Sequence, residues 1–239
     1  MKFSLRFIKS IIAEIKDVLF PQICVGCNEE GNWLCSACSK GLPFSDNKNC
    51  LSCSKFLPSG SICRDCSQKS YLDGLVVLYK YEEKNIIARL IKLFKYSGVE
   101  EIVDVLEKMA ADFFWEPKRV GFTPDVLVPV PLHPRRERER GYNQAYLIAK
   151  IFAYHFPEAV LDAESLVRKK YTEQQAKLAR EKRMRNIQDV FVWVGEGDCP
   201  AQVLLVDDVY TTGSTMEECA KTLKQAGARE VWGIVLARG

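Results

Sequence analysis

Apolar and polar positions follow one another along this chain in patterns that predict alternating strands and helices. Short apolar runs indicate buried strands, and apolar residues recurring every three or four positions indicate helices. The expected strands cover residues 71–83, 125–130, 203–206 and 231–236. The expected helices cover residues 86–98, 102–113, 146–156 and 216–226. Because strands alternate with helices, we expect an α/β fold with a parallel sheet flanked by helices.

The first twenty residues carry a pattern of their own. Leu5, Ile8, Ile12, Ile15 and Leu19 recur at helical spacing, which predicts an amphipathic helix over residues 1–20. Charged residues interrupt this stretch, so we expect no membrane span, and a secretory signal is only weakly indicated. The apolar stripe is expected to pack on the body of the protein or on a partner, in a cytoplasmic protein.

Composition changes this picture little. Apolar residues make up 47% and charged residues 27% of the 239 residues, as in an ordinary folded domain. The net charge of +3 is too small to indicate nucleic-acid binding by itself. The distribution of the ten cysteines is more informative, because eight of them lie between residues 24 and 66.

Those eight cysteines form four C-x-x-C pairs: Cys24 and Cys27, Cys35 and Cys38, Cys50 and Cys53, Cys63 and Cys66. Both thiolates of such a turn can face one tetrahedral ion, so two turns complete a Cys₄ site. The segment holds too few large apolar residues for a core, and small modules often use metal instead. We predict two structural Zn²⁺ ions in a module over residues 21–68. Sequential and cross-braced pairing of the turns both fit the spacing, and disulfides would need an oxidising compartment.

The most informative polar segment follows the strand that ends at Val206. Two acids, Asp207 and Asp208, come first, and a loop then opens the next helix with the residues Thr211, Thr212, Gly213, Ser214 and Thr215. In α/β sheets ligands bind at the carboxyl ends of strands. Backbone N–H groups of such a loop suit a phosphate, and the two carboxylates suit sugar hydroxyls or a metal held by a diphosphate. A plain strand–turn–helix with a capping Thr or Ser needs neither two acids nor so many hydroxyl groups.

Two basic segments add candidate anion contacts. The run after the strand at 125–130 contains Arg135, Arg136, Arg138 and Arg140. Arginine forks bind phosphate oxygens in bidentate fashion, so a diphosphate clamp competes with a solvated charged loop as the interpretation of this run. The basic segment over residues 166–186 is interpreted either as a lid over an anionic ligand or as a nucleic-acid contact surface.

The segment from Val203 to Thr215 resembles the signature of type I phosphoribosyltransferases, in which four apolar residues precede two acids and Thr-Thr-Gly-Ser-Thr. This resemblance implies that Thr211 to Thr215 cradle the 5′-phosphate of phosphoribosyl diphosphate (PRPP), bound with Mg²⁺. It also implies that Asp207 and Asp208 meet the ribose hydroxyls, with Asp208 as a candidate general base.

Residues 18–239 as a whole resemble the ComF/GntX family of phosphoribosyltransferase-like proteins. The motifs are Leu19-Phe-Pro, the cysteine module, Val130-Pro-Leu-His, Arg138-x-Arg-Gly-Tyr-Asn-Gln144, and a lid motif with Thr172, Gln175, Arg183 and Asn186. The resemblance implies a double zinc ribbon followed by a type I phosphoribosyltransferase fold over residues 71–239.

The same resemblance implies a role in natural competence, where imported single-stranded DNA is handled and a helicase-type partner takes part. Two functions follow from it. One is a PRPP-binding protein of competence, and the other is an active phosphoribosyltransferase that transfers phosphoribosyl to a nucleobase in nucleotide salvage.

Overall fold

The computed structural model describes residues 21–57, 60–96, 101–116, 120–170 and 189–239. Two compact units divide the chain, Met1–Leu42 and Pro43–Gly239. The smaller unit contains helix α2, Ser36–Lys40, and every other described helix or strand belongs to the larger unit. The predicted helix over residues 1–20 lies outside the described residues, and the predicted domain boundary near residue 70 stays a prediction.

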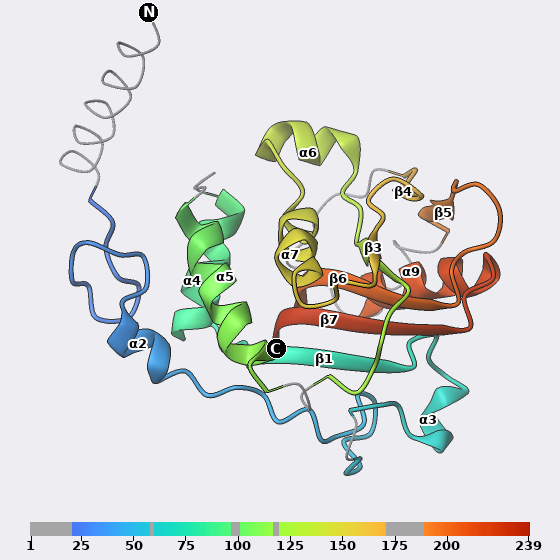
Figure 1. Cartoon of the computed structure of the whole chain (residues 1–239), viewed down its shortest axis with the longest axis horizontal. Coiled ribbons are helices and arrows are strands. Elements are labelled where there is room, and N and C mark those ends of the chain that lie inside the picture. Colours follow the sequence, from blue (N-terminus) through green and yellow to red (C-terminus); the bar gives the residue numbers. More distant parts are fainter. Residues whose placement is uncertain (1–20, 58–59, 97–100, 117–119, 171–188) are drawn as a thin grey trace, which may run out of the picture. The chain divides into compact units, whose positions relative to one another are not determined.

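A five-stranded parallel sheet in the order β1-β7-β6-β2-β3 forms the centre of the larger unit. Figure 1 shows β1, β7 and β6 lying side by side. These strands are β1 Gly74–Lys80, β2 Val126–Pro129, β3 Val160–Leu161, β6 Gln202–Tyr210 and β7 Glu230–Arg238. A separate antiparallel pair consists of β4 Leu166–Arg168 and β5 Phe191–Trp193. The parallel sheet confirms the predicted α/β class, whereas β3, β4 and β5 were too short to be predicted.

The described helices of the larger unit are α3 Arg64–Ser67, α4 Ile86–Tyr96, α5 Glu101–Phe114, α6 Pro134–Arg140, α7 Gln144–Ala153 and α9 Ser214–Gln225. The apolar periodicity predicts α4, α5, α7 and α9, whereas the short helices α3 and α6 were not predicted from it. One apolar core joins α9 to alternate residues of β6, Val203 and Leu205, so Leu204 and Val206 face the opposite side. Among the described helices, none has the length and apolar character needed to cross a membrane.

The strand order creates a topological switch point between β2 and β6. The connection from β2 through α7 continues to β3 at one edge, while the connection from β6 through α9 continues to β7 on the other side. Right-handed crossovers therefore place α7 and α9 on opposite faces of the sheet. A crevice for a ligand forms at the carboxyl ends of two strands whose connections diverge in this way. The expected place for a ligand is therefore at the carboxyl ends of β2 and β6.

The free edge of β1 is covered by the segment that contains the second group of cysteines. Backbone N–H groups of Ser45 and Ile62 donate to the carbonyls of Leu78 and Asp73 at 2.9 and 2.8 Å. Between them the Asn47 side chain donates to Val77 O and accepts from Val77 N, each at 2.9 Å. The amide of Asn47 therefore replaces one residue of a neighbouring strand and satisfies an otherwise open edge.

Replacing Asn47 by Asp should weaken this edge. Asp tolerates the left-handed backbone of position 47, where φ is 48°, but it puts a carboxylate oxygen against the Val77 carbonyl in place of a donor. We expect the free energy of unfolding in urea to fall by about 1–3 kcal/mol. The exposed neighbour Asn49 provides the control, since Asn49→Asp makes the same charge change and should cost less than about 0.5 kcal/mol. Equal losses in both variants would contradict the role given to Asn47.

Candidate functional site

The two predicted acids lie within β6, not after it. Sequence analysis predicts that the strand ends at Val206, but β6 continues to Tyr210 because β7 pairs with it along its whole length. The acids therefore sit on a rigid strand at the switch point. Asp208 is buried, with 8% of its surface exposed, and its backbone N–H donates to Asp207 Oδ1 at 2.8 Å.

The loop after β6 presents an open helix N-terminus. Gly213 is the N-cap of the twelve-residue helix α9, and no side chain caps this end. The Thr212 and Ser214 hydroxyl oxygens lie 3.0 Å apart beside it. Gly213 has φ 78°, and a Cβ at this position would come within 2.9 Å of the Tyr210 ring. The uncapped N–H groups and the positive end of the helix dipole are suited to bind an anion.

A lysine that sequence analysis did not single out neutralises one of the acids. Lys95 Nζ, from α4, lies 2.7 Å from Asp208 Oδ2, and only 11% of the Asp208 side chain is exposed. A largely buried carboxylate needs such a partner to stay ionised. Lys95 and Asp208 are 113 positions apart, so no local pattern could have paired them.

The neighbouring carboxyl group, that of Asp207, is in a different electrostatic state. Burial of the carboxyl group, together with repulsion from Asp208, raises the pKa of Asp207 to about 7. The charges of Lys95 and Arg168 act in the opposite direction and do not offset the rise. Two adjacent acids therefore differ: Asp208 is ion-paired with Lys95, and Asp207 takes up a proton near neutral pH.

Arg168, at the end of β4, is a second cation of the site that was not among the predicted site residues. Its pKa is lowered by burial and by the positive charge of Arg136, while Cys219 and Asp207 act to raise it. Its guanidinium lies 5.5 Å from the centre of the Phe191 ring. Arg168 therefore lies near enough to both Arg136 and Asp207 for electrostatic interaction, which is repulsive with Arg136 and attractive with Asp207.

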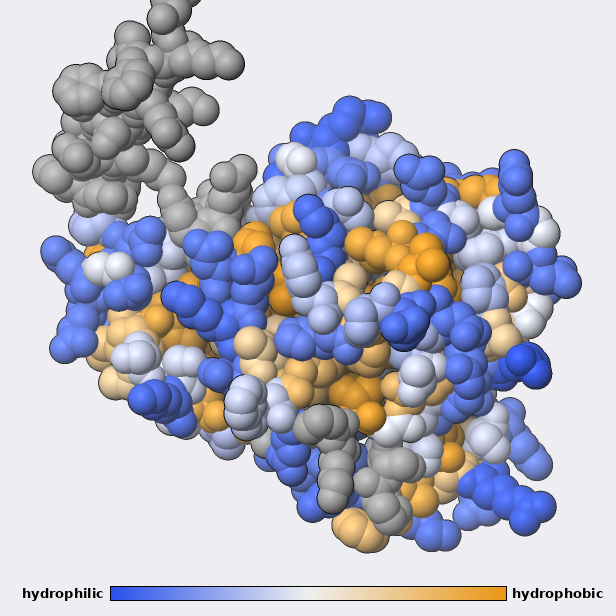
Figure 2. All heavy atoms as spheres, in the orientation of Figure 1, coloured by the Kyte–Doolittle hydropathy of each residue, from blue (hydrophilic) through white to orange (hydrophobic). Residues whose placement is uncertain are grey.

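The arginine run forms the short helix α6 at the carboxyl end of β2. His133 caps its start by accepting from Arg135 N at 3.2 Å, and Gly141 ends it with φ 87°. Arg135 and Arg138 are exposed, whereas Arg136 and Arg140 are half-buried. Figure 2 shows hydrophilic side chains gathered over α6. Of the four predicted arginines, Arg136 is the one whose charge acts on Arg168 beside the acids.

The residues after α6 hold the backbone in place. Asn143 caps α7 by accepting from Ala145 N at 3.0 Å, and its amide donates to Val130 O at 3.1 Å. The Tyr142 hydroxyl donates to the carbonyl of Phe94, next to Lys95. This part of the motif therefore connects α6, β2 and α4 around the switch point. The four lid candidates Thr172, Gln175, Arg183 and Asn186 lie outside the described residues.

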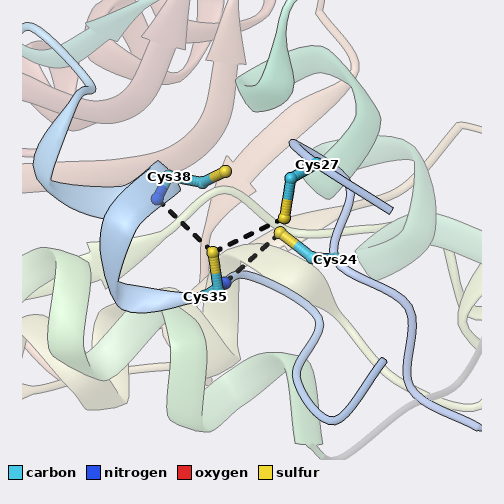
Figure 3. Close-up of side chains that lie close together, drawn as sticks. All are labelled: Cys24, Cys27, Cys35 and Cys38. Carbon is cyan, nitrogen blue, oxygen red and sulfur yellow. Dashed lines mark hydrogen bonds between the residues drawn. The ribbon is translucent and has the colours of Figure 1, made fainter. Parts of the chain in front are cut away.

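All ten cysteines are free thiols, and eight of them form two clusters. In the smaller unit the Sγ atoms of Cys24, Cys27, Cys35 and Cys38 lie within 4.8 Å of one another and point toward a common centre (Figure 3). The Sγ atoms of Cys27 and Cys35 are 3.7 Å apart. Sulfurs at 2.3 Å from a tetrahedral ion lie about 3.8 Å apart, so the spacing fits zinc.

The second cluster repeats the first. It consists of Cys50, Cys53, Cys63 and Cys66, with Sγ atoms of Cys53 and Cys63 3.5 Å apart. In each cluster the third cysteine donates its backbone N–H to the sulfur of the first at 3.4 Å. Each cluster combines two consecutive C-x-x-C turns. Of the two pairings compatible with the sequence, the structure therefore has the sequential one.

Within each cluster the pKa is lowered for one thiol and raised for another. Burial disfavours the thiolate of Cys24 and of Cys50, but backbone N–H groups that donate to the sulfur outweigh it and lower the pKa of both to about 6. Hydrogen bonds with the neighbouring cluster thiols raise the pKa of Cys38 and Cys66 to about 12. A cluster with this arrangement takes up a divalent cation and releases the remaining protons.

Comparison with known proteins agrees with this architecture. Residues 15–67 match the family described as "Double zinc ribbon domain". "Competence protein F" of Haemophilus influenzae is 36% identical over 119 residues, which cover 48% of this chain and 51% of that protein. "DNA utilization protein YhgH" of Salmonella typhi is 37% identical over 114 residues, covering 46% and 48%. The chain is therefore similar to a double zinc ribbon domain at its N-terminal end, and to competence and DNA utilization proteins over about half of its length.

The chain spans about half the length of the curated relatives it matches. A solved structure described as a purine phosphoribosyltransferase from Pyrococcus horikoshii matches with a TM-score of 0.35 and 19% identity. That match covers 57% of this chain and 82% of the other.

Zinc content tests the two clusters directly. We expect elemental analysis of the purified protein to give two Zn²⁺ per chain, because eight thiols are grouped at zinc-ligand spacing. Cys27→Ser should reduce the content to one. The buried Cys199, which belongs to neither cluster, serves as the control, and Cys199→Ser should leave two. Protein without zinc whose thiols are joined as disulfides would contradict the assignment.

The raised pKa of Asp207 predicts a pH-dependent stability. The unfolded chain loses this proton near pH 4 and the native protein near pH 7, so native stability falls as the pH rises through that interval. Asp207→Asn should therefore raise the urea midpoint relative to the parent protein at pH 8, and the gain should shrink toward pH 5.

The matched variant is Asp208→Asn, which removes the partner of Lys95 and should give no gain at either pH. A gain for Asp207→Asn that is the same at pH 5 and pH 8 would contradict a raised pKa.

Proposed function

We propose that this protein binds PRPP with Mg²⁺ at the carboxyl ends of β2 and β6. The observation that carries the proposal is the combination of adjacent acids on β6 with the uncapped N-terminus of α9 directly after them. An anion at the helix start and polyol hydroxyls at the acids would lie next to each other. A phosphorylated sugar is the ligand class that uses both.

Each part of PRPP has a partner of suitable chemistry. The 5′-phosphate would accept from the N–H groups of Thr211 to Thr215, and the ribose hydroxyls would donate to Asp207 and Asp208. The diphosphate would face Arg136, with Arg168 near Asp207. Among the described residues, only the cysteine clusters group three or more metal-ligating side chains. Mg²⁺ would therefore be held mainly by the diphosphate and water, as it commonly is.

Binding and turnover are separate questions for this site. In a transferase, the C1–oxygen bond to diphosphate breaks and a base nitrogen forms the new bond to C1. Catalysis would then rest on positioning and charge stabilisation. The Asp208 carboxyl group could stabilise a positively charged sugar, and the cations beside it could stabilise a departing diphosphate. Such a reaction in nucleotide salvage is the alternative function.

We favour a role in handling single-stranded DNA in the cytoplasm, because the similar proteins are named for competence and DNA utilization. Their names concern the relatives, and the matched segments cover about half of each. PRPP would then act as a ligand that controls the protein, and the DNA would contact other surfaces. Diphosphate release in the presence of nucleobases would support the salvage alternative instead.

Calorimetry with PRPP and Mg²⁺ tests the proposed site. We expect binding to the parent protein, and a loss of about tenfold or more in affinity for the double variant Asp207→Ala, Asp208→Ala. A hydrogen bond to a charged group contributes roughly 1.5–3 kcal/mol. Arg136→Ala should also weaken binding, whereas Arg138→Ala, on the exposed side of the same helix, should change it by less than about twofold.

The same variants separate a PRPP site from a DNA surface. A labelled single-stranded oligonucleotide is titrated into each variant at several salt concentrations. If the acids and Arg136 bind PRPP, their replacement leaves the salt dependence of DNA binding unchanged. Unaltered PRPP affinity in the double Asp variant would sink the proposal.

A further inference from the structure

The two cysteine clusters have unequal relations to the candidate site. The first belongs to the smaller unit, Met1–Leu42, and the second belongs to the larger unit together with β6 and α9. Cys50 and Cys63 are buried in the same apolar core as Met216 and Cys219 of α9. The second cluster is therefore built into the domain that carries the phosphate loop, Thr211–Thr215.

One connection between them runs through Arg238, the last residue of β7. Arg238 Nη2 donates to the carbonyl of Leu51 at 3.0 Å. Leu51 lies inside the turn between Cys50 and Cys53, so its carbonyl direction depends on the conformation of that turn. The Arg238 guanidinium also lies 5.7 Å from the centre of the Tyr210 ring, within range for a cation–π contact.

Tyr210 carries this connection to the phosphate loop. Its side chain is buried, and its ring lies so close to Gly213 that no Cβ would fit between them. Gly213 is the N-cap of α9, where the backbone turns to present its N–H groups. The Tyr210 ring therefore packs against the loop at Gly213, and the same ring is in contact with Arg238.

A second connection starts four residues after the last ligand of the second cluster. The Ser70 hydroxyl donates to Glu217 Oε1 at 2.6 Å, and Tyr71 N donates to Glu217 Oε2 at 2.8 Å. Glu217 lies in the first turn of α9, and its backbone N–H donates to the carbonyl of Gly213 at 2.9 Å. The chain leaving the second cluster is thus bound to the start of the same helix.

We propose that the second cysteine cluster, when it holds its metal, sets the conformation of the phosphate loop, with Arg238 and Tyr210 as positioning residues. A metal at Cys50, Cys53, Cys63 and Cys66 fixes the turn at Leu51, which fixes Arg238, Tyr210 and Gly213 in succession. The first cluster has no such role. The inference rests on the proposed function only where it concerns PRPP, since the loop's conformation is measurable without a ligand.

Hydrogen–deuterium exchange of the full-length, zinc-loaded protein tests this inference. Cys53→Ser and Cys27→Ser form a matched pair, because both residues are exposed second ligands of their clusters. We expect amide exchange over residues 208–217 to become at least tenfold faster in Cys53→Ser. In Cys27→Ser it should change by less than about twofold, although each variant loses one zinc. Equal effects on this segment would overturn the inference.

A variant that retains both metals guards against general unfolding. Arg238→Met keeps the apolar stem but loses the donor to Leu51 and the charge over Tyr210. We expect two zinc ions, an unchanged exchange rate in α7, and exchange over residues 208–217 faster by severalfold. Arg238→Lys should restore part of the protection. No change over residues 208–217 in Arg238→Met would also overturn the inference.

PRPP affinity of the same variants separates the two proposals. If the parent protein binds PRPP, Cys53→Ser and Arg238→Met should bind it more weakly and Cys27→Ser as well as the parent does. Faster loop exchange without PRPP binding in the parent would leave the structural coupling standing and remove the proposed ligand. If the parent protein and all three variants bind PRPP and loop exchange is unaltered, the proposed ligand stands and the structural coupling is overturned.

Discussion

Two like charges on consecutive residues of the central strand constrain everything around them. Asp207 and Asp208 belong to β6, between β7 and β2, where the chain cannot move them apart. One is compensated by Lys95 at 2.7 Å, and burial with repulsion raises the pKa of the other to about 7. A protein that only needed a stable sheet would place apolar or single acidic residues here, since an uncompensated buried charge costs stability. Strongly perturbed carboxyl groups cluster at functional sites, which supports the proposed ligand site.

The surroundings of the acids are shaped to keep that site in place. Tyr142 and Asn143 connect α6, α4 and β2, so the arginine helix stands over the carboxyl end of the sheet. Arg238 donates to the carbonyl of Leu51, between two ligands of the second cysteine cluster, and lies over the ring of Tyr210, which packs against Gly213 at the start of α9. The rigid parts of the site are strands and capped helices, which is where a ligand-binding geometry is best preserved.

How much of this follows from the sequence depends on the range of the interaction. The apolar runs predict β1, β2, β6 and β7 because long buried strands leave a local signature. They miss β3 and the β4–β5 pair, which are two or three residues long and are defined by their partners. The end of β6 is predicted four residues early, at Val206 in place of Tyr210. A polar Asp pair resembles a strand end, and only pairing with β7 extends the strand beyond it.

In the candidate site, too, local features are predictable from the sequence and long-range contacts are not. The loop, the acids and the eight cysteines are recognisable because their spacing is local. Lys95 is found only in the fold, because it lies distant in sequence from Asp208. Arg168 belongs to the basic segment that the sequence indicates, but only the fold places it near Asp207. The pairing of the cysteine turns was open in the sequence, since both pairings suit the spacing. The backbone donors that fold consecutive turns onto one centre decide it.

The central claim is that a phosphorylated sugar lies between the β6 acids and the start of α9. The most direct measurement is a crystal structure of the full chain grown with PRPP and Mg²⁺. The account predicts the 5′-phosphate within hydrogen-bonding distance of the backbone N–H groups of Thr211 to Thr215, and the ribose hydroxyls on Asp207 and Asp208. A ligand that binds elsewhere, or a ribose that makes no contact with these two acids, would contradict it.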